Sequence, residues 1–177
     1  MSAVTPQTAL IVTAGAQEAA AALQRLLRVP VQAEGFGGAD AGQLGVERSA
    51  ADVASSHGPR AVVIAFEASG GISGTLALVI DDAVAQWLAG HLTGAVTLDG
   101  DIGSGALAAL AELGNIVASA FLNGAARVVG RTCLPSVPRV IHSSTSEALI
   151  AAVKAGTTVR VATLRTQQQW FSVIFTG

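Results

Sequence analysis

Charged residues are scarce in this chain, which first raises the question of a membrane protein. Asp, Glu, Lys and Arg make up 12% of the 177 residues, about half the share in an average soluble domain. The longest charge-free stretches, 1–17 and 83–98, fall short of the roughly 18 residues that a spanning helix needs. Because 35 residues are alanine, the apolar composition reflects small side chains, and we expect no transmembrane segment.

Cysteine, aromatic residues and basic clusters are also sparse, and each shortage excludes a class of protein. The single cysteine, Cys133, excludes an intramolecular disulfide and a cysteine-cluster metal site. A net charge of −2, without a Lys/Arg cluster and with 4% aromatic residues, disfavours nucleic-acid binding. The first basic residue is Arg25, so the N-terminus lacks the basic region of a secretory signal. We expect a cytoplasmic protein.

Hydrophobic periodicity and turn residues predict a chain of mixed helices and strands. Thr5-Pro6 and Asp81-Asp82 are suited to begin helices, whereas Gly94 and Gly130 are suited to end them. The predicted helices cover 6–28, 81–92, 105–129 and 144–154, with a helical turn within 47–54. The predicted strands cover 29–33, 60–67, 72–80, 157–165 and 169–176, and Pro135 and Pro138 keep 132–141 extended.

Each of the two long helices has one apolar side that we expect to be buried. The apolar positions of the first are Leu10, Leu23, Leu26 and Leu27, and those of the second are Leu110, Leu113, Ile116, Val117 and Phe121. Each long helix is followed by an extended segment, an intervening segment and a pair of strands. This order predicts one domain over 1–177 with pseudo-repeats of about 5–98 and 99–177. An offset of 102 residues places Arg25 on Arg127.

Several common catalytic and ligand motifs are absent. His57, His91 and His142 have no ligand-like neighbours at metal spacing, so we expect ordinary surface or helix-end histidines and no metal site. Neither a Gly-x-Ser-x-Gly elbow nor a phosphate loop occurs, which argues against a serine hydrolase and against nucleotide binding. The acidic segment 99–103 lacks the further ligands of a calcium loop and is predicted to be a solvated loop.

One polar pair remains on the otherwise apolar second long helix. Glu112 and Asn115 are three residues apart and therefore share a helical face. They could be no more than the polar stripe of an amphipathic helix. However, Pro138 follows Asn115 after 22 intervening residues. With this spacing, and with ELGNIVASAFL and PSVPRV around it, the chain resembles the CheC, CheX and FliY family of chemotaxis phosphatases.

The resemblance implies an α/β (α+β) fold of the CheC type, in which two long helices related by a pseudo-twofold pack on an antiparallel sheet. This chain departs from the motif of the family at two places. The family has Asp or Ser four residues before the glutamate, where this chain has Ala108. At the first site of the family, the offset of 102 places Leu10 at the glutamate position and Thr13 at the asparagine position, so we expect that site to be lost.

The function implied by the resemblance is dephosphorylation of the aspartyl phosphate of a CheY-like response regulator. Glu112 and Asn115 would be the catalytic residues, and Pro138 would have a structural role. The protein would need no cofactor of its own, because the magnesium ion belongs to the regulator. A non-catalytic binding module similar to FliM is the alternative. A CheD-like partner and a homodimer also stay open.

Overall fold

The computed structural model describes residues 6–37, 42–94 and 102–177, and a mixed sheet-and-helix fold is built from them. The helices are α1 (Pro6–Leu27), α2 (Ala50–Ser56), α3 (Asp82–Thr93), α4 (Ser104–Val129) and α5 (Thr145–Val153). The strands are β1 (Gln32–Glu34), β2 (Val46–Ser49), β3 (Arg60–Gly70), β4 (Gly74–Asp81), β5 (Cys133–Pro135), β6 (Arg139–Ser144), β7 (Thr158–Arg165) and β8 (Trp170–Thr176).

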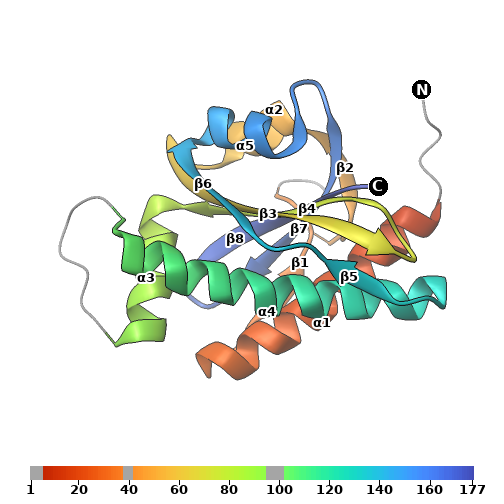
Figure 1. Ribbon diagram of the computed structural model, residues 1–177, viewed down its shortest axis with the longest axis horizontal. Helices are drawn as coiled ribbons and strands as arrows, with labels where there is room; N and C mark the ends of the chain where they lie inside the picture. Colours follow the sequence, from red (N-terminus) through yellow and green to blue (C-terminus); the bar gives the residue numbers. More distant parts are fainter. Residues whose placement is uncertain (1–5, 38–41, 95–101) are drawn as a thin grey trace.

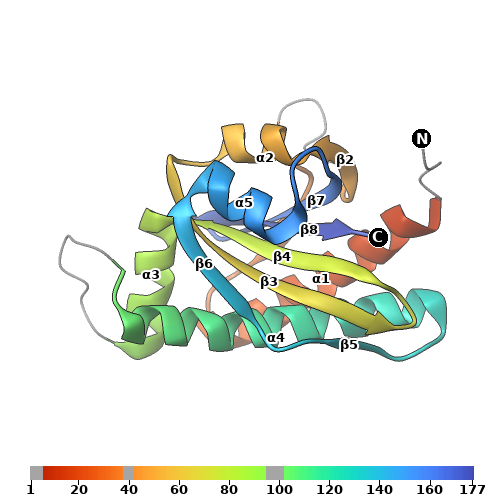
Figure 2. The same ribbon diagram turned by 45° about the horizontal axis from the view of Figure 1, so that its top comes forward.

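The strands form one antiparallel sheet between two layers of helices. Its order is β1-β7-β8-β4-β3-β5, with β2 also paired to β7 and β6 also paired to β3. The helices α1, α3 and α4 lie on one face, and the shorter α2 and α5 lie on the other (Figures 1 and 2). Each face has its own apolar core, because successive residues of a strand point to opposite sides of the sheet.

The predicted fold class is confirmed, as are the long helices, the β3–β4 hairpin and the two closing strands. The helix ends follow the predicted chemistry. Gly94 ends α3 with φ 70° and Gly130 ends α4 with φ 68°, which is a left-handed conformation that glycine adopts without the penalty of a side chain. Thr5 and the acidic residues Asp99 and Asp101 lie outside the described residues.

The helical turn expected within 47–54 is present, because α2 begins at Ala50, and the residues up to Ser49 belong to β2 and pair with β7. Two other local expectations were wrong. The strand expected at 29–33 lies at Gln32–Glu34 instead, where it pairs with the end of β7. Asp81 is the N-cap residue of α3, but its side chain makes no capping hydrogen bond.

The sheet pairings of the two halves mirror one another. In the first half β1 and β2 both pair with β7, and in the second half β5 and β6 both pair with β3. The two halves meet where β4 pairs with β8. An internal duplication would produce this topology, and the boundaries of the two repeats stay a prediction.

One described helix, α4, is long and apolar enough to cross a membrane by length and composition. Its apolar side packs with α1, α3 and the sheet in the larger of the two cores. The core helix of a globular domain passes the same test of length and composition. By itself such a helix is only weak evidence for a membrane span.

Candidate functional site

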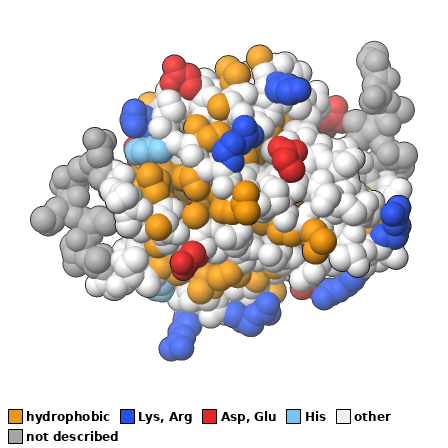
Figure 3. Space-filling model, viewed as in Figure 1, with side chains coloured by type: hydrophobic (Ala, Val, Ile, Leu, Met, Phe, Trp, Pro, Cys, Tyr) orange, Lys and Arg blue, Asp and Glu red, His pale blue; other side chains and the backbone are white. Residues whose placement is uncertain are grey.

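The outward side of α4 carries the polar pair predicted from the sequence. Leu110, Leu113, Val117 and Phe121 are buried as predicted. Ile116 is not, since 41% of its surface is exposed. It belongs to the opposite, outward side, which also exposes Ala108, Glu112 and Asn115. Figure 3 shows this face of the molecule, where hydrophobic side chains gather over α4 and the neighbouring strands and charged side chains are few.

The side chains of Glu112 and Asn115 are available to an external partner. Neither makes a side-chain hydrogen bond or an ion pair with the residues that the structure describes. Glu112 also carries the only formal charge between residues 102 and 126. The site thus presents one carboxylate, which only accepts hydrogen bonds when ionised, beside one carboxamide, which both donates and accepts.

Gly114, between these two residues, faces the sheet. A Cβ atom at this position would lie 2.9 Å from Cγ2 of Ile64 and 3.3 Å from Cζ of Phe66. The absence of a side chain therefore allows α4 to approach β3 closely. This contact places the part of α4 that carries Glu112 and Asn115 directly against residues 64–66 of β3.

Pro138 lies in a β-bulge next to the same stretch of β3. Pairing of β3 with β5 stops at Ala68 and Pro135, and pairing with β6 starts at Ala65 and Arg139. Two residues of β3 therefore face the three residues 136–138, so the second strand has one extra residue, as in a β-bulge. Ser136 bridges the gap, since its amide donates to the carbonyl oxygen of Glu67 (2.9 Å) and its hydroxyl accepts from the amide of Glu67 (2.9 Å).

The bulge explains why a proline is tolerated here and where it lies. Proline has no N–H to donate to a ladder, so within sheets it occurs at edges and bulges. The bulge faces residues 66 and 67 of β3, and Gly114, between Glu112 and Asn115, packs on Phe66, so both segments lie against the same stretch of β3. Both ribbon views show the β5 edge of the sheet running alongside α4 (Figures 1 and 2).

The equivalent positions on α1 carry no carboxylate and no amide. Leu10 is 59% exposed, so the expectation that it shares the buried face of α1 with Leu23 and Leu27 was wrong. The hydroxyl of Thr13 donates to the carbonyl oxygen of Ala9 (2.9 Å) within the helix. An exposed leucine and an internally bonded threonine cannot replace the chemistry of a glutamate and an asparagine.

His57 is a helix-end residue, since it is the C-cap of α2, but its side chain is fully buried, which the sequence did not predict. Its Nδ1 lies 2.6 Å from Oδ1 of Asp81, and its Nε2 lies 2.9 Å from the hydroxyl of Ser172. His91 contacts the carbonyl oxygen of Leu27 at the end of α1 (2.7 Å), and His142 contacts Asp82 (3.0 Å).

The order Ser172–His57–Asp81 resembles the hydrogen-bond chain of a serine hydrolase, in which the serine must reach a substrate carbonyl. Ser172 is completely buried in the centre of the sheet, between β4 and β7. No carbonyl group can therefore approach its Oγ, and the chain of hydrogen bonds is structural. Sequence inspection missed it because its members are 24 and 115 residues apart.

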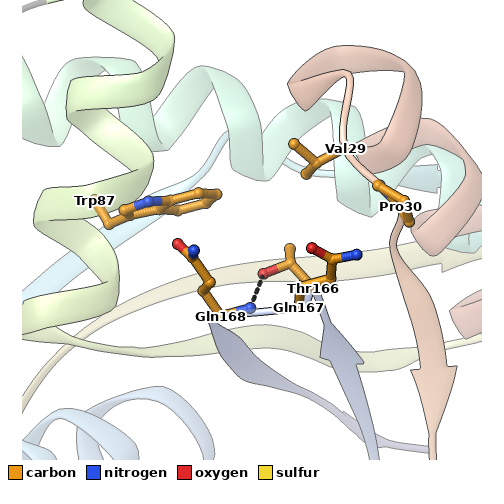
Figure 4. Close-up of a pocket in the computed structure, with 6 residues that line it drawn as sticks. All are labelled: Val29, Pro30, Trp87, Thr166, Gln167 and Gln168. Carbon is orange, nitrogen blue, oxygen red and sulfur yellow. Dashed lines mark hydrogen bonds between the residues drawn. The ribbon is translucent and has the colours of Figure 1, made fainter.

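Two other features offer neither metal ligands nor acid–base groups among the described residues. Among the described residues no group of three His, Cys, Asp or Glu side chains could hold a metal ion. A pocket of about 160 Å³ lies beside Trp87 of α3, opposite Val29 and Pro30 and above the β7–β8 turn with Gln168 (Figure 4). Its lining contains no titratable side chain, so it offers no acid–base chemistry.

Comparisons with known proteins place these features in a wider context. Residues 106–142, which contain Glu112, Asn115 and Pro138, match the CheC-like family. A search of curated sequences gives no match. Among solved structures, FliY from Thermotoga maritima superposes with a TM-score of 0.73 at 17% identity, over 99% of this chain and 92% of that one.

Two further structures are similar in fold at low identity. The CheX–CheY–BeF3–Mg complex from Borrelia burgdorferi gives a TM-score of 0.65 at 16% identity, over 94% of this chain and 96% of that one. The FliM middle domain from Vibrio alginolyticus gives 0.61 at 13% identity, over 96% and 92%. The fold is thus shared by chemotaxis proteins of more than one kind.

Proposed function

From the premise that this chain is CheC-like, in its fold and in the segment 106–142, we propose that it dephosphorylates a CheY-like response regulator. The exposed, unpartnered pair of Glu112 and Asn115 on α4 is the observation that carries the proposal. The similarity in fold to a CheX that was crystallised with CheY, BeF3 and Mg supports the choice of partner.

Hydrolysis of an aspartyl phosphate requires little from the catalytic protein beyond positioning. A water molecule attacks phosphorus in line, the bond between phosphorus and the aspartate oxygen breaks, and the carboxylate leaves with the electron pair. The proton released by the water passes to the phosphate product. Placing that water correctly supplies much of the rate acceleration. Asn115 can hold the water through its carboxamide, which has both donors and an acceptor.

Glu112 is proposed to position the regulator rather than to transfer a proton. Its carboxylate would pair with a lysine of the regulator, which keeps Asn115 beside the phosphoryl group. The magnesium ion and the phosphoryl group belong to the regulator, so the chain needs no cofactor of its own. Pro138 would shape the bulge beside the site and take no part in the chemistry.

The test is the rate of phosphate loss from a purified, phosphorylated CheY-like regulator with and without this protein. We expect acceleration by the wild type, and we expect Asn115→Ala to remove about a hundredfold or more of it, as loss of one positioned polar group often does. Asn123→Ala is the matched control, because Asn123 is exposed on the same helix outside the site. Equal activity of the two variants would contradict the proposal.

A non-catalytic binding module is the second candidate function, and Ala108 is the observation that favours it. The residue one turn before Glu112 has no polar group here, and the FliM middle domain shares the fold. Such a module would bind the activated regulator without accelerating phosphate loss, and Asn115→Ala would leave both properties unchanged. A cytoplasmic location stays a prediction from the N-terminal sequence, and a CheD-like partner and a homodimer stay predictions from the resemblance.

A further inference from the structure

A row of polar side chains crosses the sheet on the face covered by α2 and α5, opposite the face that α4 covers. Glu67, Thr75 and Thr176 are direct neighbours across β3, β4 and β8. The hydroxyl of Thr75 donates to the carboxylate of Glu67 (3.3 Å), and the amide of Thr75 donates to the hydroxyl of Thr176 (2.9 Å). The next row inward is apolar, with Ala65, Ala77 and Ile174 in the core.

The C-terminal end of α5 lies over this row and leaves a cavity of about 460 Å³ between them. Its lining includes Glu67, Thr75 and Thr176 from the sheet, and Ala152, Lys154 and Thr157 from the end of α5 and the turn after it. The size is within the range of small-molecule sites, which is about 300 to 1,000 Å³.

Two cationic side chains line the same cavity. Arg139 pairs with Ala65 of β3, two residues from Glu67, and so lies diagonally from Glu67 on the same face. Its guanidinium donates to the carbonyl oxygen of Ala152 (3.3 Å), which directs it beneath α5. Lys154 ends α5 with φ 68° and ψ 152°, a conformation that costs a non-glycine residue energy and is often found at functional sites.

These three charged residues are exposed to solvent, and no neighbouring side chain in the described part of the chain neutralises their charges. Among the described residues Glu67, Arg139 and Lys154 form no ion pair, although the cavity contains both signs. Side chains of opposite charge that line one cavity without forming an ion pair are suited to a ligand that carries both a positive and a negative charge. The cations would bind an anionic group, and the carboxylate would bind a cationic one.

We propose that this cavity binds a small zwitterion of the α-amino-acid class. Its carboxylate would pair with Arg139 and Lys154, and its ammonium group would pair with Glu67 and donate to the hydroxyl of Thr75. The side chain of the amino acid would lie against the apolar end of α5, at Ala152. The proposal concerns the face of the sheet opposite α4 and does not depend on the phosphatase function.

The test is a titration of the full chain with each of the twenty common α-amino acids, followed by heteronuclear NMR. We expect at least one amino acid to shift the amide signals of the cavity residues and not those of α4. Two analogues of a binding amino acid are then compared with it, one without its amino group and one without its carboxylate. For leucine these are 4-methylpentanoate and 3-methylbutylamine.

Variants connect binding to the proposed contacts. Glu67→Gln and Arg139→Gln should each weaken binding about tenfold or more, as loss of a hydrogen bond to a charged group does. Arg131→Gln is the control, because Arg131 is exposed and is not among the residues that line the cavity. Glu112→Gln should leave amino-acid binding unchanged. A shift of the α4 signals alone, equal affinity of either analogue, or no shift with any amino acid would overturn the proposal.

Discussion

Asp81 occupies the N-cap position of α3, but its carboxylate contacts His57 and leaves the helix uncapped. A buried imidazole is costly unless both ring nitrogens have partners. Asp81 satisfies one nitrogen of His57, and the hydroxyl of Ser172 satisfies the other. The lost capping bond is therefore the cost of joining the end of α2, the end of β4 and the strand β8 through one buried ring.

Acid unfolding should report on Asp81. Partial burial opposes ionisation of its carboxyl, but the hydrogen bond from His57, the attraction to that ring and the amide of Gly58 together lower its pKa below 3.8. A lowered carboxyl pKa contributes stability that is present above the unfolded value and is lost as the pH falls through the folded one. The stability difference between the wild type and Asp81→Asn should therefore shrink as the pH falls below about 4.

Urea unfolding at a series of pH values measures this difference. Ser172→Ala serves as a comparison, because it removes the other hydrogen bond and leaves the Asp81–His57 contact intact. We expect it to lower the free energy of unfolding by about 1 to 3 kcal/mol. A stability difference for Asp81→Asn that stays the same from pH 3 to pH 7 would contradict the assignment.

The two long helices are the elements that bring the halves of the molecule together. They run in opposite directions along the same face of the sheet (Figure 1), and glycines of both helices lie in the contact between them. A Cβ atom on Gly124 of α4 would lie 2.7 Å from the carbonyl carbon of Ala14 and 2.9 Å from Cα of Gly15. A Cβ atom on Gly15 would lie 2.7 Å from the ring of Phe121.

Substitution at this crossing should be costly in a way that helix propensity does not predict. Gly124→Ala adds a methyl group against backbone atoms, so we expect the free energy of unfolding to fall by about 1 to 3 kcal/mol. Gly105→Ala on the same helix is the matched control, because nothing lies within 4 Å of its added Cβ. The control should be neutral or stabilising by up to about 1 kcal/mol.

Chemical denaturation of the two variants separates the effects. If the crossing were loose, both alanines would stabilise the protein to a similar extent. A substantial loss for Gly124→Ala alone would show that the contact between the helix backbones is part of the native packing.

At the scale of the whole molecule, the mirrored topology offers two equivalent positions for a site, but only the position on α4 carries a carboxylate and a carboxamide. α4 presents Glu112 and Asn115, whereas α1 presents Leu10 and Thr13. We therefore expect one activated regulator per chain. Isothermal titration with a regulator held in its beryllofluoride form measures this ratio.

The control for this titration is the double variant Glu112→Gln, Asn115→Ala, which should abolish or strongly weaken binding if α4 forms the docking site. A ratio of two regulators per chain would contradict the loss of the first site. Undiminished binding by the double variant would contradict the location on α4.

Much of the fold and the polar pair could be predicted because the responsible interactions are local. Helix ends at Gly94 and Gly130 follow from backbone conformation, and Glu112 and Asn115 share a face because residues three apart always do in a helix. The exposure of Ile116 was mispredicted, since hydrophobic character alone does not tell which side of an apolar helix meets the sheet.

The sequence by itself determined the type and order of most elements, the scarcity of charge on α4, and the spacing from Asn115 to Pro138. Only the tertiary structure decided that the two ends of this spacing lie against the same stretch of β3, one through Gly114 and the other through the bulge at 136–138. It also decided the burial of His57 and the row in which Thr75 of β4 lies between Glu67 of β3 and Thr176 of β8. Such contacts depend on strand register, which is set by many weak interactions between residues far apart in the chain.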